Sequence, residues 1–207
     1  MIGSRIHPTA LVESDVTIGD GTAVWDHAHL RSGARVGRDC IIGEKAYLAG
    51  GVIVGDRVKI NACAYLCAGV HLADGVMVAA HVVFTNDRFP RATDPELREL
   101  LASAPGPTTE ATFVGRGATL GANATIGPGL RIGEFAMVGM GAVVVADVPA
   151  HGLVLGNPAR LVGLVGRDGK PVLRMKVGEG LPAQARVPCA DGGVLRVEDG
   201  AVRWEPA

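Results

Sequence analysis

The chain has 207 residues, of which 48% are hydrophobic and 20% charged, and its 20 Lys and Arg against 21 Asp and Glu give a net charge of -1. Because no excess of positive charge is available to neutralise phosphates, the composition excludes a basic nucleic-acid-binding protein. High hydrophobic content at a net charge near zero also excludes a disordered chain. Only 4% of the residues are Phe, Tyr or Trp, which predicts a narrow core filled by aliphatic side chains.

An aliphatic residue recurs every six positions through most of the chain. From residue 6 to residue 84, fourteen consecutive positions in steps of six are apolar, and the pattern resumes from residue 114 to residue 144. The residue four positions after each is usually small or β-branched. A period of six fits neither a helix nor a simple strand. It predicts short strands joined by tight turns, three to a coil, with residues 18 apart stacked on neighbouring coils about 4.8 Å apart.

A first block of these repeats covers residues 5–84, and residues 85–113 then break the pattern with four prolines. Within the break, Asp94 followed by Pro95 predicts the start of one short helix. A break of this length in a regular solenoid is usually functional or disordered. Two more coils are expected over residues 114–149.

The last part of the chain closes the solenoid and adds a different unit. Residues 152–163 are expected to close the repeat, and residues 167–207 are more polar, with turn signals. Asp199-Gly200 lies between two alternating segments and predicts a β-hairpin. We expect a small β element that packs on the prism or on a neighbouring subunit.

The N-terminal residues lack the continuous apolar run of a secretory signal peptide, and the longest apolar run, near residues 135–146, is too short to span a bilayer. The four Cys residues form no metal-ligand pattern. We therefore expect a reduced, cytoplasmic protein that binds neither membranes nor nucleic acids.

One corner of the predicted coil carries polar side chains in register. Steps of 18 from His27 meet Lys45, Cys63 and His81. Such a corner can bind a polar ligand, or it can be a solvated edge whose side chains are satisfied by water. His81 comes just before the break in the repeat, and histidine is a natural proton acceptor near neutral pH.

The segment VFTNDRFPRA, residues 83–92, resembles the entry to the active-site loop of sugar-nucleotide N-acetyltransferases. The repeats, GATLGANATIG at 117–127 and DVPAHGLVLGNPAR at 147–160, extend the resemblance to the hexapeptide-repeat acyltransferase family over about residues 5–165. The subgroup that it resembles most acts on UDP-2-acetamido-3-amino-2,3-dideoxy-glucuronate.

The resemblance implies an all-β protein. Residues 1–165 are expected to form a left-handed parallel β-helix, a triangular prism with an excursion loop at 85–113, and residues 166–207 a C-terminal β extension. The family also implies a homotrimer whose active sites lie between adjacent prisms. The implied activity is acetyl-CoA-dependent N-acetylation of the amino group of a nucleotide-linked amino sugar.

The resemblance also assigns site residues. Asn86 is expected to orient the amine or to donate to the oxyanion, and His81 to accept the proton; an Asn that begins a loop can instead bond its own backbone. Acetyl-CoA, the expected co-substrate, would lie along the C-terminal coils against Gly139 and Ala142, with Arg160 on a CoA phosphate. Small residues at those two positions also suit the packing of the prism.

The acceptor is expected to contact Arg88 and Arg91, which can pair with phosphates or a carboxylate, together with His27 and Lys45. Loop arginines of this kind are otherwise often solvated. The chain differs from the subgroup on the same corner, at Lys45 and at two equivalent places, which leaves a different small amine as an alternative acceptor.

Two other functions are compatible with a hexapeptide prism. A γ-type carbonic anhydrase holds zinc with three histidines, whereas the histidines here are scattered, so no metal is expected. The other alternative is a non-catalytic β-solenoid binding protein, against which the loop and the Gly-Asn-Pro-Ala-Arg segment argue.

Overall fold

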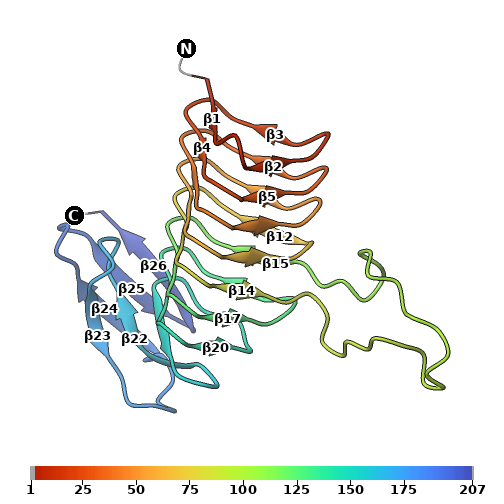
Figure 1. The fold of residues 1–207 in the computed structure, drawn as a ribbon. Helices are drawn as coiled ribbons and strands as arrows, with labels where there is room; N and C mark the ends of the chain where they lie inside the picture. The colour runs from red at the N-terminus through yellow and green to blue at the C-terminus, as the bar shows by residue number, and fades with distance from the viewer. Residues whose placement is uncertain (1–2, 207) are drawn as a thin grey trace.

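In the computed structural model, which describes residues 3–206, short parallel strands stack into a triangular prism with a small antiparallel sheet beside it (Figure 1). Three sheets form the faces of the prism, here called sheets A, B and C. Sheet A continues past the repeat into β22 and β23, which pair antiparallel. The stacked parallel strands confirm the predicted β-helix, while its left hand stays a prediction.

The strand bounds follow the repeat. Sheet A contains, in spatial order, β1 (Arg5–Ile6), β4 (Ala23–Val24), β7 (Ile41–Ile42), β10 (Lys59–Ile60), β13 (Met77–Val78), β16 (Thr119–Leu120), β19 (Met137–Val138), β21 (Gly152–Leu155), β22 (Arg160–Val165) and β23 (Pro171–Arg174). Sheet B contains β2 (Leu11–Val12), β5 (His29–Leu30), β8 (Tyr47–Leu48), β11 (Tyr65–Leu66), β14 (Val83–Phe84), β17 (Thr125–Ile126) and β20 (Val143–Val144). Sheet C contains β3 (Thr17–Ile18), β6 (Arg35–Val36), β9 (Ile53–Val54), β12 (Val70–Leu72), β15 (Thr112–Val114) and β18 (Arg131–Ile132).

The period of six places the aliphatic residues in the core, as predicted. The second residue of each two-residue strand from β4 to β20 is buried, and Leu30, Ile42 and Leu48 are completely so. Neighbouring strands of one sheet are in register at 18 residues, as in the pairing of Tyr47 with Tyr65. The core is therefore a thin column of aliphatic side chains, which accounts for the scarcity of aromatic residues.

The residues that turn the chain at the corners of the prism adopt a left-handed backbone conformation, with positive φ. His27, Lys45, Cys63 and His81 have φ values of 54, 56, 58 and 59°, and they turn the chain from sheet A to sheet B; we call this corner AB. Corner BC, between sheets B and C, is turned by glycines such as Gly51. The repeating turn explains why the residues predicted to share one corner do so.

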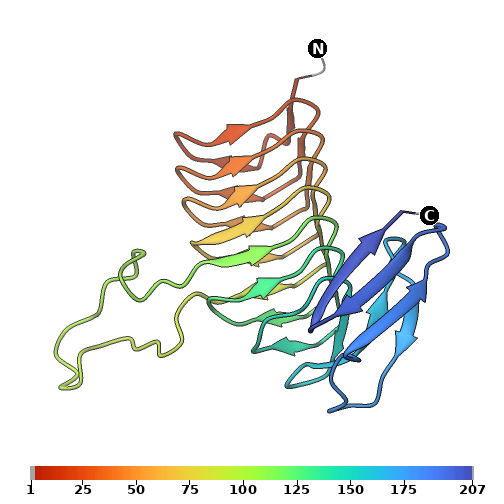
Figure 2. The same ribbon diagram turned by 180° about the vertical axis from the view of Figure 1, so that it is seen from behind.

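The loop at 85–111 leaves the prism after β14 and returns at β15, so it emerges from corner BC (Figures 1 and 2). Both views show it projecting away from the prism. At its base, the N–H of Glu110 donates to the carbonyl oxygen of Asn86 at 2.9 Å. The solenoid continues across it, because β14 pairs with β17 in the same parallel register.

The prediction of a short helix after Asp94 is wrong. Residues 92–100 instead form a turn closed by an antiparallel bridge between Thr93 and Leu100. One Asp94 carboxylate oxygen accepts the N–H of Arg98 at 2.7 Å, and Leu97 has a φ of 59°. A residue in the left-handed region so soon after the cap ends the turn before a helix can propagate.

Among residues 3–206, no helix is long and apolar enough to cross a membrane.

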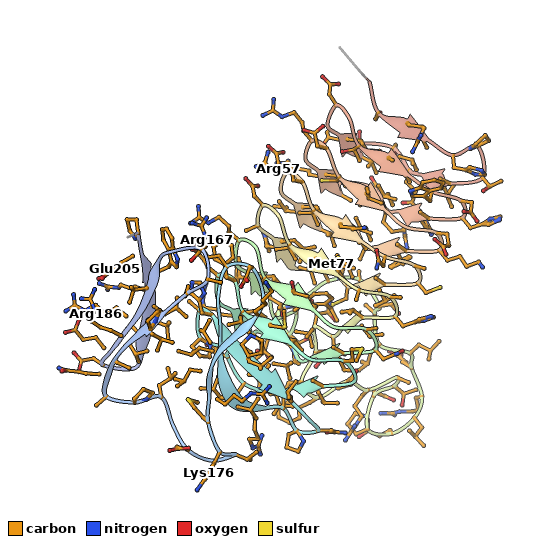
Figure 3. The ribbon with its side chains drawn as sticks, turned by 90° about the vertical axis from the view of Figure 1, so that its left-hand side faces the viewer. Arg57, Met77, Arg167, Lys176, Arg186 and Glu205 are labelled. Atoms are coloured by element: carbon orange, nitrogen blue, oxygen red, sulfur yellow. The ribbon has the colours of Figure 1, made fainter. Side chains whose placement is uncertain are left out.

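The C-terminal sheet contains β24 (Gln184–Pro188), β25 (Val194–Glu198) and β26 (Ala201–Glu205), and the predicted hairpin at Asp199-Gly200 is confirmed. Its apolar side covers Leu164, which is completely buried. Arg167 stacks over the rings of both Phe135 and Trp204. Figure 3 shows Arg167 on the side of this sheet toward the prism, and Arg186 with Glu205 on the opposite side. The extension is thus held against the prism by apolar and cation–π contacts.

His151 is buried where the prism meets this extension. Its side chain is 3% exposed, its ring stacks on Phe135, and its Nδ1 bonds the carbonyl oxygen of Val165 at 3.0 Å. Burial lowers the pKa of His151 below its usual 6.5, because the charged ring would be desolvated. At neutral pH the ring is therefore uncharged.

This burial predicts a loss of stability in acid. The unfolded chain binds a proton at His151 at a higher pH than the folded chain does, so the free energy of unfolding falls as the pH decreases below about 6.5. His151→Asn, which tolerates the left-handed φ of 59°, is expected to flatten this decline. Urea unfolding at a series of pH values from 7.5 to 5 measures it. His7→Asn at an exposed site is the control, and an unchanged slope in His151→Asn contradicts the assignment.

Candidate functional site

A cavity of about 600 Å³ lies between sheet B, corner BC and the returning part of the loop. Its floor contains small side chains, among them Ala49 and Ala68, and loop residues such as Ala104 form the opposite wall. The volume is in the range of small-molecule sites. One end of the cavity is at Asn86 and the other at Glu13 and Arg31.

Asn86 is held at its end of this cavity by two hydrogen bonds. Its Nδ2 donates to the carbonyl oxygen of Ala68 at 3.1 Å, and its backbone oxygen accepts from Glu110. The amide orientation follows from chemistry, since a carbonyl oxygen only accepts. Its Oδ1 has no hydrogen-bond partner within residues 3–206 and is available to accept a bond from a ligand. The side chain bonds across coils and not to its own loop.

Cys67 lies on the floor between the two ends of the cavity. Its side chain is buried, and this burial raises the pKa of the thiol to about 11. Because the thiolate and not the thiol is the nucleophile, Cys67 is unreactive at neutral pH. An acyl group that reaches this cavity is therefore not expected to pass through a cysteine thioester.

Glu13, Arg31 and Tyr47 line the far end of the cavity, and His29, which is not part of the lining, completes a polar cluster with them by contacting Glu13. Glu13 Oε1 lies 2.8 Å from His29 Nε2 and 2.6 Å from Arg31 Nε. Arg31 Nη1 donates to the Tyr47 hydroxyl at 3.1 Å. The Ser32 N–H, followed by His29 and Arg31, holds the pKa of Glu13 at about 2, so the carboxyl group is ionised at neutral pH.

Two members of this cluster, His29 and Tyr47, belong to a row of rings along sheet B. Tyr47 and Tyr65 stack with ring centroids 5.0 Å apart and planes 5° apart, and His29 meets Tyr47 edge-on at 5.3 Å. All three occupy the outward position of neighbouring strands, 18 residues apart. Of these rings, Tyr47 and Tyr65 line the cavity and form an apolar wall along it.

The arginines predicted to bind the acceptor line a different hollow. Arg88 and Arg91 border a second cavity of about 460 Å³ against the loop. Arg88 donates from Nε and Nη2 to the two carboxylate oxygens of Glu110 at 3.2 and 3.1 Å. Arg91 donates to the carbonyl oxygen of Pro90. Arg88 thus closes the base of the loop.

The predicted residues of corner AB lie together but apart from the main cavity. His27, Lys45 and His81 are exposed and stack along one edge of sheet B, whereas Asn86 lies at the opposite edge. Within one chain, the structure therefore does not bring His81 to Asn86. The roles of His27, Lys45 and His81 stay predictions.

The predicted cofactor residues lie near corner AB at the C-terminal end. Ala142 is completely buried, and a side chain at Gly139 would overlap that of Leu155. Packing therefore requires a small residue at position 142, whereas a side chain at position 139 would displace only the exposed side chain of Leu155. Arg160 is exposed at the start of β22, where it bonds the carbonyl oxygen of Ala159 at 3.0 Å. Of the three, only Arg160 presents a charged group to solvent.

Metal-ligating side chains do not gather: residues 3–206 contain no group of three His, Cys, Asp or Glu placed to hold an ion. The four cysteines are all free.

Comparison with known protein families identifies the repeat. The bacterial transferase hexapeptide repeat matches residues 15–50 and 33–67, and the hexapeptide repeat of succinyl-transferase matches residues 112–146. The chain thus carries hexapeptide repeats on both sides of its loop, as the sequence predicted.

Curated relatives match over shorter stretches. The dTDP-3-amino-3,6-dideoxy-alpha-D-galactopyranose 3-N-acetyltransferase of Aneurinibacillus thermoaerophilus is 46% identical over 54 residues, which cover 26% of this chain and 28% of that protein. Serine acetyltransferase 4 of Arabidopsis thaliana is 46% identical over 52 residues, which cover 25% of this chain and 15% of that protein. The matched region therefore spans less than a third of either relative.

Solved structures share the fold over a larger part of the chain. AntD, an N-acyltransferase from Bacillus cereus whose mutant was solved with dTDP and coenzyme A, aligns with a TM-score of 0.60 at 19% identity, covering 73% of this chain and 85% of AntD. The acetyltransferase domain of PglB from Neisseria gonorrhoeae aligns with a TM-score of 0.50 at 21% identity, covering 78% of this chain and 58% of that chain. Both confirm the fold.

Proposed function

We propose that the protein is an acetyl-CoA-dependent N-acetyltransferase that acetylates the amino group of a nucleotide-linked amino sugar. The observation that carries the proposal is the cavity at corner BC, with the amide of Asn86 anchored at one end and its Oδ1 free. The names of the relatives support it: one is an N-acetyltransferase of a dTDP-linked amino sugar, and AntD is an N-acyltransferase.

Asn86 orients the amine in this proposal. Its Oδ1 accepts a hydrogen bond from the amine N–H, which directs the nitrogen lone pair toward the thioester carbonyl. The nitrogen attacks that carbon, the tetrahedral oxyanion collapses, and the carbon–sulfur bond breaks to release the CoA thiolate. A proton leaves the nitrogen. The buried, protonated Cys67 takes no part.

The proton acceptor in this proposal is His81, which requires a second copy of the chain. His81 and Asn86 lie on opposite edges of sheet B in one chain, so a trimer that sets corner AB of one prism against corner BC of the next unites them. Exposed apolar side chains on the loop support such packing: Phe89 is 80% exposed and Leu100 83%. A neighbouring copy would remove these side chains from water.

The C-terminal end of corner AB is the proposed place for acetyl-CoA. Arg160 is exposed there and would pair with a CoA phosphate. The backbone near Gly139 and Ala142, where neither residue projects a side chain outward, would lie along the pantetheine arm.

A thiol-release assay with acetyl-CoA tests this function. The panel contains UDP- and dTDP-linked amino sugars, the corresponding free amino sugars and simple amines such as serine. We expect thiol release and an acetylated product with at least one nucleotide-linked amino sugar. Reaction with non-sugar amines alone overturns the sugar acceptor and supports the alternative of a different small amine. No thiol release with any amine, together with no acetyl-CoA binding in calorimetry, overturns the acetyltransferase.

A further inference from the structure

At corner BC, a carboxylate accepts a hydrogen bond from a backbone N–H. The equivalent N–H one coil later has no carboxylate beside it in the described part of the chain. Glu13 Oε2 accepts the N–H of Ser32 at 2.9 Å. One coil, or 18 residues, further on, Arg31 takes the place of Glu13 and Gly50 that of Ser32. The N–H of Gly50 has no hydrogen-bond partner within residues 3–206. The cation Arg31 thus replaces the anion, and an N–H donor is left without an acceptor.

The Arg31 side chain is held in place by two contacts that leave several of its guanidinium N–H groups unused by the described residues. Its Nε contacts Glu13 and its Nη1 donates to Tyr47. The other guanidinium N–H groups have no partner within the described chain, and the side chain is 47% exposed. A guanidinium fixed on one side presents a fork of N–H groups on the other, which fits a phosphate or a carboxylate. Gly50 and Arg31 line the same cavity.

The charge of Arg31 is balanced by Glu13, which is ionised at neutral pH because its pKa is about 2. An anion at this place would therefore be bound by directed N–H donors rather than by an excess of positive charge. This distinguishes the site from an exposed basic patch, whose binding depends on net charge and salt.

We propose that Arg31 and the N–H of Gly50 bind the diphosphate of the nucleotide-linked acceptor. The inference rests on the proposed function, which places the acceptor's amine at Asn86. Gly50 precedes Asn86 on corner BC by two coils, or about 10 Å at the spacing of strands. In a nucleoside diphosphate sugar with its amine on C3 or C4, five to eight bonds of about 1.5 Å each separate the nitrogen from the two phosphorus atoms. Such an acceptor spans the cavity.

The N–H donors of Arg31 and Gly50 would recognise the diphosphate and would not distinguish one nucleotide base from another. Besides the donors, this end of the cavity offers the apolar wall of Tyr47 and Tyr65, of which Tyr65 is 44% exposed. An aromatic wall packs against any ribose or base. We therefore expect UDP and dTDP to bind with similar affinity.

Calorimetric titration of the full chain with UDP and with dTDP, in the absence of acetyl-CoA, tests the proposal. Arg31→Ala is expected to raise the Kd of both by about 10- to 100-fold, the usual effect of losing hydrogen bonds to a charged group. Arg31→Lys keeps the charge but loses the fork, and Tyr47→Phe loosens Arg31; both are expected to raise the Kd by a smaller factor. Arg35→Ala, on the exposed side of sheet C, is the matched control and should leave the Kd unchanged.

The outcomes separate this inference from the proposed function. If the wild-type protein acetylates amino sugar nucleotides but Arg31→Ala and Arg31→Lys bind UDP as tightly as wild type, the diphosphate site is wrong and the function stands. If UDP binding depends on Arg31 but no amino sugar nucleotide is acetylated, the anion site stands and the function is wrong. If Arg31 matters only for a free amino uronic acid and not for UDP, the group bound is a sugar carboxylate and the proposal is overturned.

Discussion

Asn86→Ala is expected to lower kcat/KM for the amine acceptor by about 100-fold, within the range seen when one fixed polar group of a transition-state site is removed. The variant takes away the Oδ1 that would orient the amine, and it leaves the carbonyl oxygen of Ala68 without its donor. Steady-state kinetics with acetyl-CoA and the nucleotide amino sugar found in the substrate panel measure the effect.

Asn86→Asp tests whether the amide of Asn86, and not only the size of its side chain, is needed. A carboxylate cannot donate to the carbonyl oxygen of Ala68 and is repelled by it, so the side chain would swing away from its present place. We therefore expect a loss similar to that of Asn86→Ala. Asn61→Ala, a half-buried asparagine after β10 with no side-chain hydrogen bond in the described structure, is the control. Wild-type turnover in both Asn86 variants and in His81→Ala would exclude the proposed mechanism.

Phe84→Ala is expected to reduce the free energy of unfolding by about 3–5 kcal/mol, the usual cost of truncating a buried Phe. Phe84 is 1% exposed and is the largest fully buried side chain among residues 3–206. It fills the prism at the coil where the loop leaves, and β14 pairs there with β17. The narrow column of side chains has no second layer that could collapse into the vacated volume.

Phe89→Ala provides the matched comparison, because Phe89 is five residues away on the loop and 80% exposed. For the isolated chain its effect should stay within about 0.5 kcal/mol. Urea unfolding followed by circular dichroism compares the two variants. Equal midpoints for Phe84→Ala and wild type would contradict the core position of this ring.

The fold could be predicted because one physical constraint acts on every coil. An inward residue that packs in a thin prism must be aliphatic, so a step of six along the chain traces the core from Val24 to Val144. The loop resisted prediction because no such constraint acts on it. There, the cap at Asp94 resembled a helix start, but a left-handed Leu97 ended the turn.

The sequence motif singles out Asn86, which lines the cavity, while its role in a reaction stays a prediction. The cluster at the other end of the cavity was not predicted, although the same step of 18 connects its members. From Glu13 that step leads to Arg31, and from His29 to Tyr47 and Tyr65. Outward positions face no packing constraint, so their chemistry varies freely, and only the register of the coils shows which of them meet.

The loop joins the prism at one corner, and the pairing of β14 with β17 and of β12 with β15 continues across it. Its two ends are tied by Asn86 and Glu110. Residues between these two points can thus be gained, lost or exchanged without changing the register of any coil. The loop that covers the cavity can therefore change in length and sequence during evolution while the coils beneath it stay the same.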